Sequence, residues 1–291
     1  MCDDLTAHEE EAALAEAGLN RRQFAAISAA GVLAACTGSQ SDAKARAGLT
    51  ESAVAITTPA GTADAFFVRP AKGQHPAIIM WPDIAGLRPA YQEMGRQLAS
   101  AGYAVLVVNH YYRSAKAPIF GSMAEWRTPE GQAKLKPMMA ALTPQTTTTD
   151  TMAFVAWLDK QPWVERKRGI GTIGYCMTGP YTVRAAAAVP RRIKAAASCH
   201  GGGLVTAAPD SPHKLIASTQ ASYLFAIARN DDSRAPGDKD ALSAAAKAAG
   251  RPAEVEVYNA DHGWCTLDAP TYDKGEAARA WARVLALFAK L

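Results

Sequence analysis

The sequence predicts an α/β fold in which a mostly parallel sheet carries helices on both faces. Short continuous apolar runs recur along the chain, and such runs are typical of strands that are buried on both faces. Helical patterns separate most of these runs, as expected for repeated strand–helix–strand units. The chain has 291 residues, of which 49% are hydrophobic and 20% charged. This length and composition suit one domain with a large core, which we place at residues 48–291.

Residues 1–47 differ from the rest of the chain and predict an export signal. Arg21 and Arg22 are followed by Phe24 and by a weakly apolar, Ala-rich stretch at residues 25–35. This order resembles a twin-arginine signal, so we expect export to the periplasm. The alternative is a plain N-terminal helix of a cytosolic protein.

The Ala-rich stretch ends in Leu33-Ala34-Ala35-Cys36, which is similar to a bacterial lipobox. Cys36 is therefore a candidate for lipidation, which would anchor the mature protein to the cell envelope. Ala-x-Ala sites within residues 43–47 would serve ordinary cleavage instead. This lipid is the one membrane contact that we expect, because no apolar stretch reaches the roughly 18–20 residues of a membrane span.

Charge and cysteine content exclude several classes of protein. The formal net charge of +4 is small and comes without a long basic run, so we expect no nucleic-acid partner. Five cysteines do not describe a disulfide framework, although a single Cys199–Cys265 bridge remains an alternative in an oxidising compartment. A zinc cluster of these two with His200 and His262 is disfavoured, since the spacing fits no compact metal motif. We expect a monomer without metal or cofactor.

The first half of the domain predicts a hairpin, then two buried strands around a helix. Pro and Gly mark the hairpin turn, and Gly102 ends the helix. The elements are expected at residues 54–58 and 65–69 (paired strands), 75–81 (strand), 88–101 (helix) and 103–109 (strand).

Residues 110–148 form a long segment with four prolines and no clear periodicity. A segment of this length in a compact domain is usually functional or contains short helices. We expect the next helix to begin at Thr149, with Asp150 in its first turn. Its expected buried side chains are Met152, Val155, Trp157 and Leu158.

The second half alternates strands and helices to the C-terminus. Strands are expected at residues 170–175, 193–198, 223–228 and 254–258, and helices at 180–189, 236–249 and 276–291. Right-handed crossovers bring the carboxyl ends of parallel strands to one edge of the sheet. That edge should collect the polar residues that end the strands, which are Asp83, His110, Cys176, His200, Asp231 or Asp232, and His262.

One of these strand ends predicts a nucleophile. Cys176 lies between Gly174 and Gly179 on a strand–turn–helix pattern, which is similar to a G-x-S-x-G elbow with Cys in place of Ser and Thr178 in place of the second Gly. A thiol at this turn needs a base to take its proton and an acid to orient the base. His262 and Asp231 follow in the chain order nucleophile, acid, histidine, and Asp232 is the alternative acid.

Residues 54–291 resemble the dienelactone hydrolases, a family of carboxymethylenebutenolidase-like α/β-hydrolases. The resemblance rests on four motifs: residues 81–86 (WPDIAG), 174–179 (GYCMTG), 229–232 (RNDD) and 261–264 (DHGW). It implies an α/β-hydrolase fold and hydrolysis of small esters or lactones through an acyl-enzyme. It also implies Cys176 as nucleophile, His262 as base, Asp231 as the orienting acid, and the backbone N–H groups of Ile84 and Met177 as oxyanion hole.

The chain departs from this family at several positions. Asp83 stands where the family has the glutamate that modulates the resting thiol, and Thr178 replaces a glycine. Arg113 matches one of two arginines that hold a substrate carboxylate, and the second is missing after His262. Tyr112, Arg113 and Trp264 are the candidates for contact with substrate. These departures leave a second hypothesis, a non-catalytic envelope-anchored protein that binds a small molecule on the same fold.

Overall fold

The computed structural model describes residues 48–291. The predicted export signal, the lipobox and Cys36 lie outside the described residues. Within residues 48–291, no helix is both long enough and apolar enough to cross a membrane.

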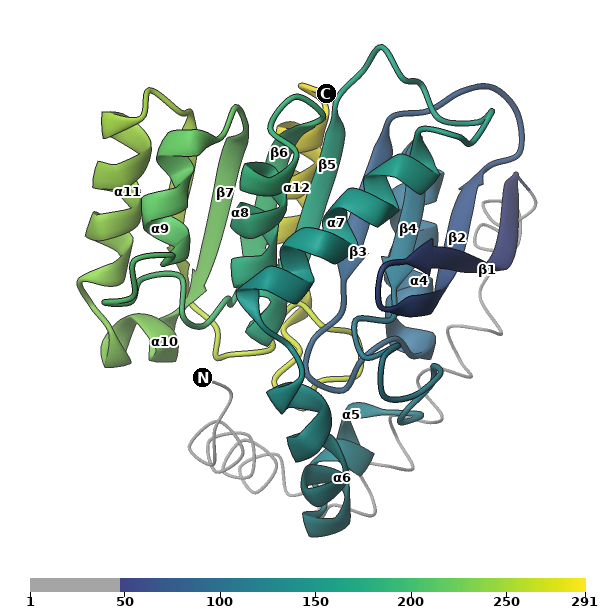
Figure 1. Cartoon of the computed structure of the whole chain (residues 1–291). Helices are drawn as coiled ribbons and strands as arrows, with labels where there is room; N and C mark the ends of the chain where they lie inside the picture. Colours follow the sequence, from purple (N-terminus) through teal and green to yellow (C-terminus); the bar gives the residue numbers. More distant parts are fainter. Residues whose placement is uncertain (1–47) are drawn as a thin grey trace.

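A single mostly parallel sheet runs through the domain (Figure 1). Its strand order is β1-β2-β4-β3-β5-β6-β7-β8. The β1–β2 and β2–β4 pairs are antiparallel, and all the later pairs are parallel. The strands are β1 (Leu49–Thr58), β2 (Gly61–Pro70), β3 (Ala77–Trp81), β4 (Ala104–Val108), β5 (Ile170–Tyr175), β6 (Ile193–Cys199), β7 (Ser222–Ala228) and β8 (Ala253–Tyr258).

The central strands explain the apolar runs of the sequence. Every residue of β3, β4 and β5 is buried, because helices cover both faces of the sheet at these positions. The predicted α/β fold with helices on both faces is therefore confirmed.

Helices cover the two faces of the sheet in two layers (Figure 1). On one face, α4 (Pro89–Ser100) and α12 (Lys274–Phe288) share one apolar cluster with the strands. On the other face, α7 (Pro144–Leu158), α8 (Gly179–Ala188) and α11 (Asp238–Ala248) share another. Shorter helices in the loops are α5 (Met123–Trp126), α6 (Pro129–Ala140), α9 (Pro212–Leu215) and α10 (Arg229–Arg234).

The helix expected to begin at Thr149 starts five residues earlier, at Pro144. Thr143 caps it by accepting from the Thr146 N–H. The threonine run that made this turn look like a loop is helical, and its hydroxyls donate to carbonyls one turn back. Because the helix faces the sheet with Phe154, Val155 and Leu158, Met152 is 56% exposed, and the prediction that it is buried was wrong.

The long segment before α7 contains α5 and α6, as the length had suggested. Both lie beyond the edge of the sheet where the parallel strands end (Figure 1). Met123, Trp126 and Leu135 from these helices pack with Ile84 and Tyr111 in a separate apolar cluster. The segment therefore covers the edge at which the candidate residues gather.

Candidate active site

Cys176 lies on a strained turn at the end of β5. Its φ angle is +56°, in the left-handed region that a residue with a Cβ rarely adopts. A single 3-10 turn (Cys176–Thr178) leads directly into α8 at Gly179. The side chain of Cys176 therefore stands at the N-terminal end of a helix, where the partial positive charge stabilises negative charge that develops on a nucleophile.

Both glycines of the elbow are required by close packing. A Cβ at Gly174 would lie 2.3 Å from the carbonyl oxygen of Thr178. A Cβ at Gly179 would lie 2.4 Å from Ser198 Oγ and 2.5 Å from Gly201 Cα. The elbow thus packs against its own turn on one side and against the end of β6 on the other.

Thr178, one of the departures noted in the sequence, ties the elbow to the end of β3. Its hydroxyl accepts from the Tyr175 N–H at 3.0 Å and lies 2.8 Å from the carbonyl oxygen of Trp81 and 2.9 Å from that of Tyr175. Trp81 directly precedes the segment that carries Ile84. The hydroxyl therefore bridges the turn of the candidate nucleophile and the start of the candidate oxyanion segment.

His262 is oriented by Asp231. Its Nδ1 donates to Asp231 Oδ2 at 2.7 Å, which leaves Nε2 to act as a base. Although burial raises the pKa of Asp231, the hydrogen bond and charge of His262 outweigh it, so the pKa is lowered. The alternative acid, Asp232, instead accepts from Lys239 at 2.8 Å.

The backbone around His262 is also held in place. Its N–H donates to Asn230 Oδ1 at 2.9 Å, and its carbonyl accepts from the Thr271 hydroxyl at 2.7 Å. Asn230 and Asp231 both lie in α10, which begins immediately after β7. The end of β7 and the loop that carries His262 are therefore joined by hydrogen bonds that involve both side chains and backbone.

His200 packs against His262, with ring centroids 4.7 Å apart. It has a φ angle of +41° and a fully buried side chain. Burial, followed by the nearby His262, lowers the pKa of His200 well below its ordinary value. Sequence reasoning placed His200 at the polar edge, and the structure adds that its neutral ring forms one wall of the His262 site.

Ile84 and Met177, the two candidate oxyanion residues, are joined by a tyrosine that the sequence did not single out. The Tyr111 hydroxyl lies 3.0 Å from the Ile84 carbonyl oxygen and 3.3 Å from Met177 Sδ. Its ring is buried and would touch a Cβ placed at Gly86. The only sequence signal is that Tyr111 directly precedes Tyr112, the tyrosine that the sequence predicts to contact substrate.

Asp83 is engaged by Arg88. Its two carboxylate oxygens accept from the Arg88 guanidinium at 2.6 and 2.9 Å, and Oδ1 also accepts from the Ala85 N–H at 3.0 Å. Arg88 binds Asp268 with its remaining donors at 2.7 and 2.8 Å. The thiol-modulating role predicted for Asp83 remains a prediction, and its observed contacts hold the Ile84 segment to the start of α4.

Tyr112 and Arg113, the candidates for substrate contact, both bind Asp150 of α7. The Tyr112 hydroxyl donates at 2.7 Å, and the guanidinium makes two bonds of 2.7 Å. The third candidate, Trp264, has no exposed surface and stacks on Tyr258. These three side chains therefore have structural partners in the observed arrangement.

A cavity of about 250 Å³ lies beside Asp231 and His262. Its walls are formed by the glycine-rich turn after β6, by α10 and by the start of α11. The lining includes Leu204, Ile227 and Leu242, and also Arg234, which binds Asp231 at 2.6 Å. The cavity can hold a small, largely apolar group next to the candidate base.

Residues 63–291 match the model of the dienelactone hydrolase family. A protein from Synechocystis sp. named "Putative carboxymethylenebutenolidase" is 28% identical over 222 residues, which cover 75% of this chain and 87% of that relative. A protein of the same name from Escherichia coli is 24% identical over 77% of this chain and 81% of the relative.

Solved structures share the fold at lower identity. The dienelactone hydrolase-like promiscuous phosphotriesterase P91 from metagenomic libraries has a TM-score of 0.68 and 21% identity, with 84% of this chain and 99% of that chain covered. A dienelactone hydrolase from Anabaena variabilis has a TM-score of 0.58 and 15% identity, with 83% and 98% covered. These structures support the fold alone, whereas the family match extends over the whole candidate site.

Proposed function

Because the chain belongs to the dienelactone hydrolase family, it is a carboxylic ester or lactone hydrolase, and we propose that it acts through a Cys176–His262–Asp231 triad and an acyl-enzyme. The observation that carries the proposal is the hydrogen bond of 2.7 Å between His262 Nδ1 and Asp231 in a chain whose elbow presents Cys176. This bond fixes the imidazole tautomer that a general base requires.

In the first half of the reaction, His262 Nε2 takes the proton of the Cys176 thiol as the sulfur attacks the ester carbonyl carbon. Negative charge moves to the carbonyl oxygen, and the N–H groups of Ile84 and Met177 stabilise it. The tetrahedral intermediate collapses with cleavage of the bond to the alcohol oxygen. The imidazolium returns its proton to that oxygen, so a neutral alcohol leaves and a thioester remains.

In the second half, a water molecule attacks the thioester carbonyl while His262 takes one of its protons. Cleavage of the carbon–sulfur bond releases the carboxylic acid, and the proton returns to the sulfur. Asp231 remains ionised throughout, since the hydrogen bond from His262 keeps its pKa low despite burial. With a lactone, the alcohol and the acid are two ends of one product.

The cavity beside the base favours a small substrate. Its volume of about 250 Å³ is below the roughly 300–1,000 Å³ of ordinary ligand sites, and its walls are mainly backbone and apolar side chains. Arg113 is bound to Asp150, so a clamp on a substrate carboxylate would require this ion pair to open. We therefore favour short, uncharged acyl groups over dicarboxylate lactones.

Ester hydrolysis by the purified protein tests the proposal. We expect turnover of p-nitrophenyl acetate, with loss of essentially all activity in Cys176→Ala. Asp231→Asn should lower kcat by about 10²- to 10⁴-fold, because the imidazole loses the partner that fixes its tautomer. Stopped-flow measurement should also show a burst of nitrophenol equal to the enzyme concentration when acyl-enzyme hydrolysis is slow.

Two matched variants serve as controls. Asp232→Asn removes the neighbouring carboxylate that binds Lys239 and should keep nearly full activity. Cys265→Ser removes a thiol outside the triad and should do the same. Undiminished hydrolysis in Cys176→Ala would overturn the proposal. Ligand binding without turnover across a panel of esters and lactones would instead favour the non-catalytic alternative.

We also infer export and lipidation at Cys36, on the basis of the twin-arginine pattern and the lipobox-like sequence. Expression of the full chain in a bacterium with a labelled fatty acid tests both. Label should appear on the wild-type protein in the envelope fraction and disappear in Cys36→Ser. Ordinary signal cleavage would give an unlabelled periplasmic protein.

A further inference from the structure

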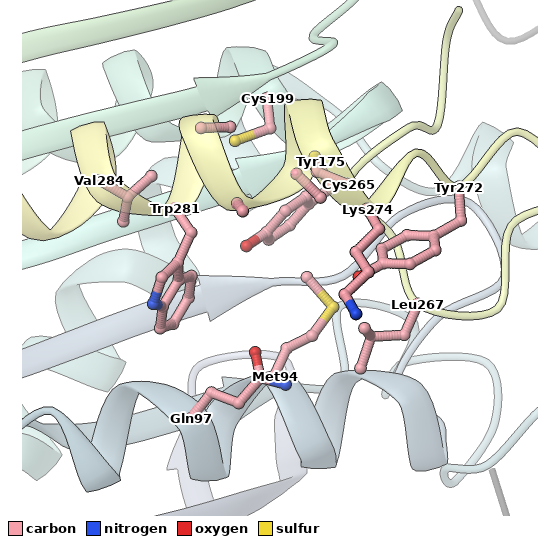
Figure 2. Close-up of a pocket in the computed structure, with 13 residues that line it drawn as sticks. Met94, Gln97, Tyr175, Cys199, Cys265, Leu267, Tyr272, Lys274, Trp281 and Val284 are labelled. Atoms are coloured by element: carbon pink, nitrogen blue, oxygen red, sulfur yellow. The ribbon is translucent and has the colours of Figure 1, made fainter. Parts of the chain in front are cut away.

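A second cavity, of about 230 Å³, opens between α4 and α12 (Figure 2). Met94 and Gln97 approach it from α4, and Trp281 and Val284 approach it from α12 (Figure 2). It shares no lining residue with the cavity beside Asp231 and His262. The proposed hydrolysis therefore does not account for it.

Two thiols line this cavity. Cys199 is the last residue of β6, and Cys265 lies in the loop three residues after His262. Both are free cysteines, and Cys265 packs against the cluster that buries Cys199. Cys199 and Cys265 are 66 positions apart in the sequence, and the fold places both thiols at one wall of an open cavity.

The environment of Cys265 favours its protonated thiol. Burial raises the pKa of the Cys265 thiol well above its ordinary value, and the neighbouring Cys199 raises it further. Cys199 is 2% exposed, whereas Cys265 is only partly buried and faces the cavity. A reagent that enters the cavity would therefore reach Cys265 before Cys199.

We propose that Cys199 and Cys265 form a reversible dithiol–disulfide site that small disulfides reach through the cavity between α4 and α12. Neither thiol has a role in the proposed hydrolysis, and packing alone requires neither two sulfurs side by side nor access to one of them. The reactant class is a small organic disulfide, such as oxidised glutathione.

The exchange proceeds in two steps. The Cys265 thiol loses its proton, and its sulfur attacks one sulfur of the small disulfide, which breaks that S–S bond and releases one thiolate. The Cys199 sulfur, after loss of its own proton, then attacks Cys265 Sγ and displaces the second small thiolate. The two protons end on the two released thiols. The protein pair is oxidised by two electrons, and one small disulfide is reduced to two thiols.

Oxidation would join two segments that support His262. Cys199 directly precedes His200, whose ring packs 4.7 Å from that of His262. Cys265 follows His262 in the loop that starts after β8. A covalent link between these segments would restrict local opening of the His262 loop, and it would also close a long loop in the unfolded chain.

Thiol mapping of the full-length protein tests the site. The reduced protein is treated with oxidised glutathione, remaining thiols are blocked with N-ethylmaleimide, and the peptides are identified by mass spectrometry. We expect the peptides containing Cys199 and Cys265 to be joined, two hydrogens lighter than their sum, and to separate with dithiothreitol. In Cys199→Ser, which lacks the resolving thiol, glutathione should remain attached to Cys265.

Two further measurements test the disulfide site without relying on ester hydrolysis. Cys176→Ala should form the same link, because the nucleophile takes no part in it. Hydrogen exchange of the peptide spanning residues 259–272 should slow after oxidation of the wild type and remain unchanged in Cys199→Ser. The proposal is overturned if both cysteines are fully alkylated after the glutathione treatment, or if glutathione accumulates on Cys265 of the wild type without the link.

Discussion

Tyr111 connects the two backbone segments that form the proposed oxyanion hole. Its hydroxyl oxygen lies 3.0 Å from the Ile84 carbonyl oxygen and 3.3 Å from Met177 Sδ. The N–H groups of Ile84 and Met177 come from different strand ends, so their separation depends on contacts such as this one. Tyr111 is thus a positioning residue rather than a group that touches the substrate.

Removal of the Tyr111 hydroxyl should slow catalysis more than it weakens binding. A buried hydrogen bond contributes about 1 kcal/mol, so Tyr111→Phe should lower kcat by roughly 5- to 10-fold. KM for a p-nitrophenyl ester should change little, because the N–H groups act on charge that develops in the transition state. Steady-state kinetics across ester chain lengths would measure both quantities.

Tyr223→Phe is the matched control for this prediction. The Tyr223 hydroxyl is also buried and bonds to Thr219 at 2.7 Å, near the opposite end of β7 from α10. It should lose a similar amount of stability and retain its kcat. Equal kcat values for Tyr111→Phe and wild type would show that the hydroxyl does not position the oxyanion hole.

The sequence was more informative about the triad than about the residues that support it. Cys176 and His262 follow strands in recognisable local motifs, so their neighbours in the chain identify them. The choice between Tyr111 and Tyr112 depends on how the chain turns after Asn109, whose side chain accepts from the Tyr111 N–H. That turn places Tyr111 in the apolar cluster of Ile84 and Tyr112 in the cluster of Phe154, and residue type alone does not reveal which ring faces Ile84.

Among the elements, α4 is linked to the active edge by one buried arginine. Arg88 lies just before α4 and binds Asp83 in the oxyanion segment and Asp268 in the loop after His262. Asp268 also accepts from the Met123 N–H at the start of α5. Burial lowers the pKa of Arg88, but Asp268 and Asp83 outweigh this effect and raise it.

Loss of this arginine should destabilise the protein strongly. Arg88→Met would leave two buried carboxylates without a countercharge, so the free energy of unfolding should fall by about 3–5 kcal/mol. Urea denaturation followed by fluorescence would measure it. Arg96→Met, within α4, is the control: Arg96 pairs with Glu51 and Glu93 near the surface, and its loss should cost about 1 kcal/mol or less. Similar losses in the two variants would contradict a structural role for the buried network.

The boundaries of strands and helices show which sequence patterns predict structure well and which do not. Continuous apolar runs located β3 and β4 to within two residues at each end, since strands in this position have no polar face. The start of α7 was missed because threonine has a low intrinsic helix propensity, which a cap at Thr143 overcomes. The Arg88–Asp268 pair joins positions 180 residues apart, and no local pattern encodes such a contact.

At the scale of the whole molecule, two buried histidines link stability to pH. Neither ring nitrogen of His110 or His200 has a hydrogen-bond partner within residues 48–291. Burial, with a smaller effect of Arg88, lowers the pKa of His110 to about 3. Burial and the adjacent His262 lower that of His200 in the same direction.

The free energy of unfolding should therefore fall as the solution becomes acidic. Below the ordinary histidine pKa of about 6.5, the unfolded chain binds protons that the folded protein excludes. Each of these histidines should then reduce stability by about 1.4 kcal/mol per pH unit, and for His110 this continues down to its folded pKa of about 3. Urea denaturation at several pH values between 8 and 5 would give the slope.

His110→Phe isolates one of the two contributions. In the wild-type protein, the ring centroids of His110 and Tyr111 are 4.1 Å apart. Phenylalanine keeps a ring beside Tyr111 and cannot bind a proton. The stability of the variant relative to wild type should increase as pH falls from 7 to 5. A difference that does not change with pH would mean that His110 takes up its proton in the folded protein as well.

The edge strand β8 has a consequence for how the protein behaves in concentrated solution. Glu254 and Glu256 alternate with valines along this strand and pair with Arg283 and Arg279 of α12. A second molecule that added a strand here would have to rearrange these ion pairs. Self-association through this edge is thus opposed by the ion pairs, and because salt weakens ion pairs between exposed side chains, light scattering should show more association as ionic strength rises.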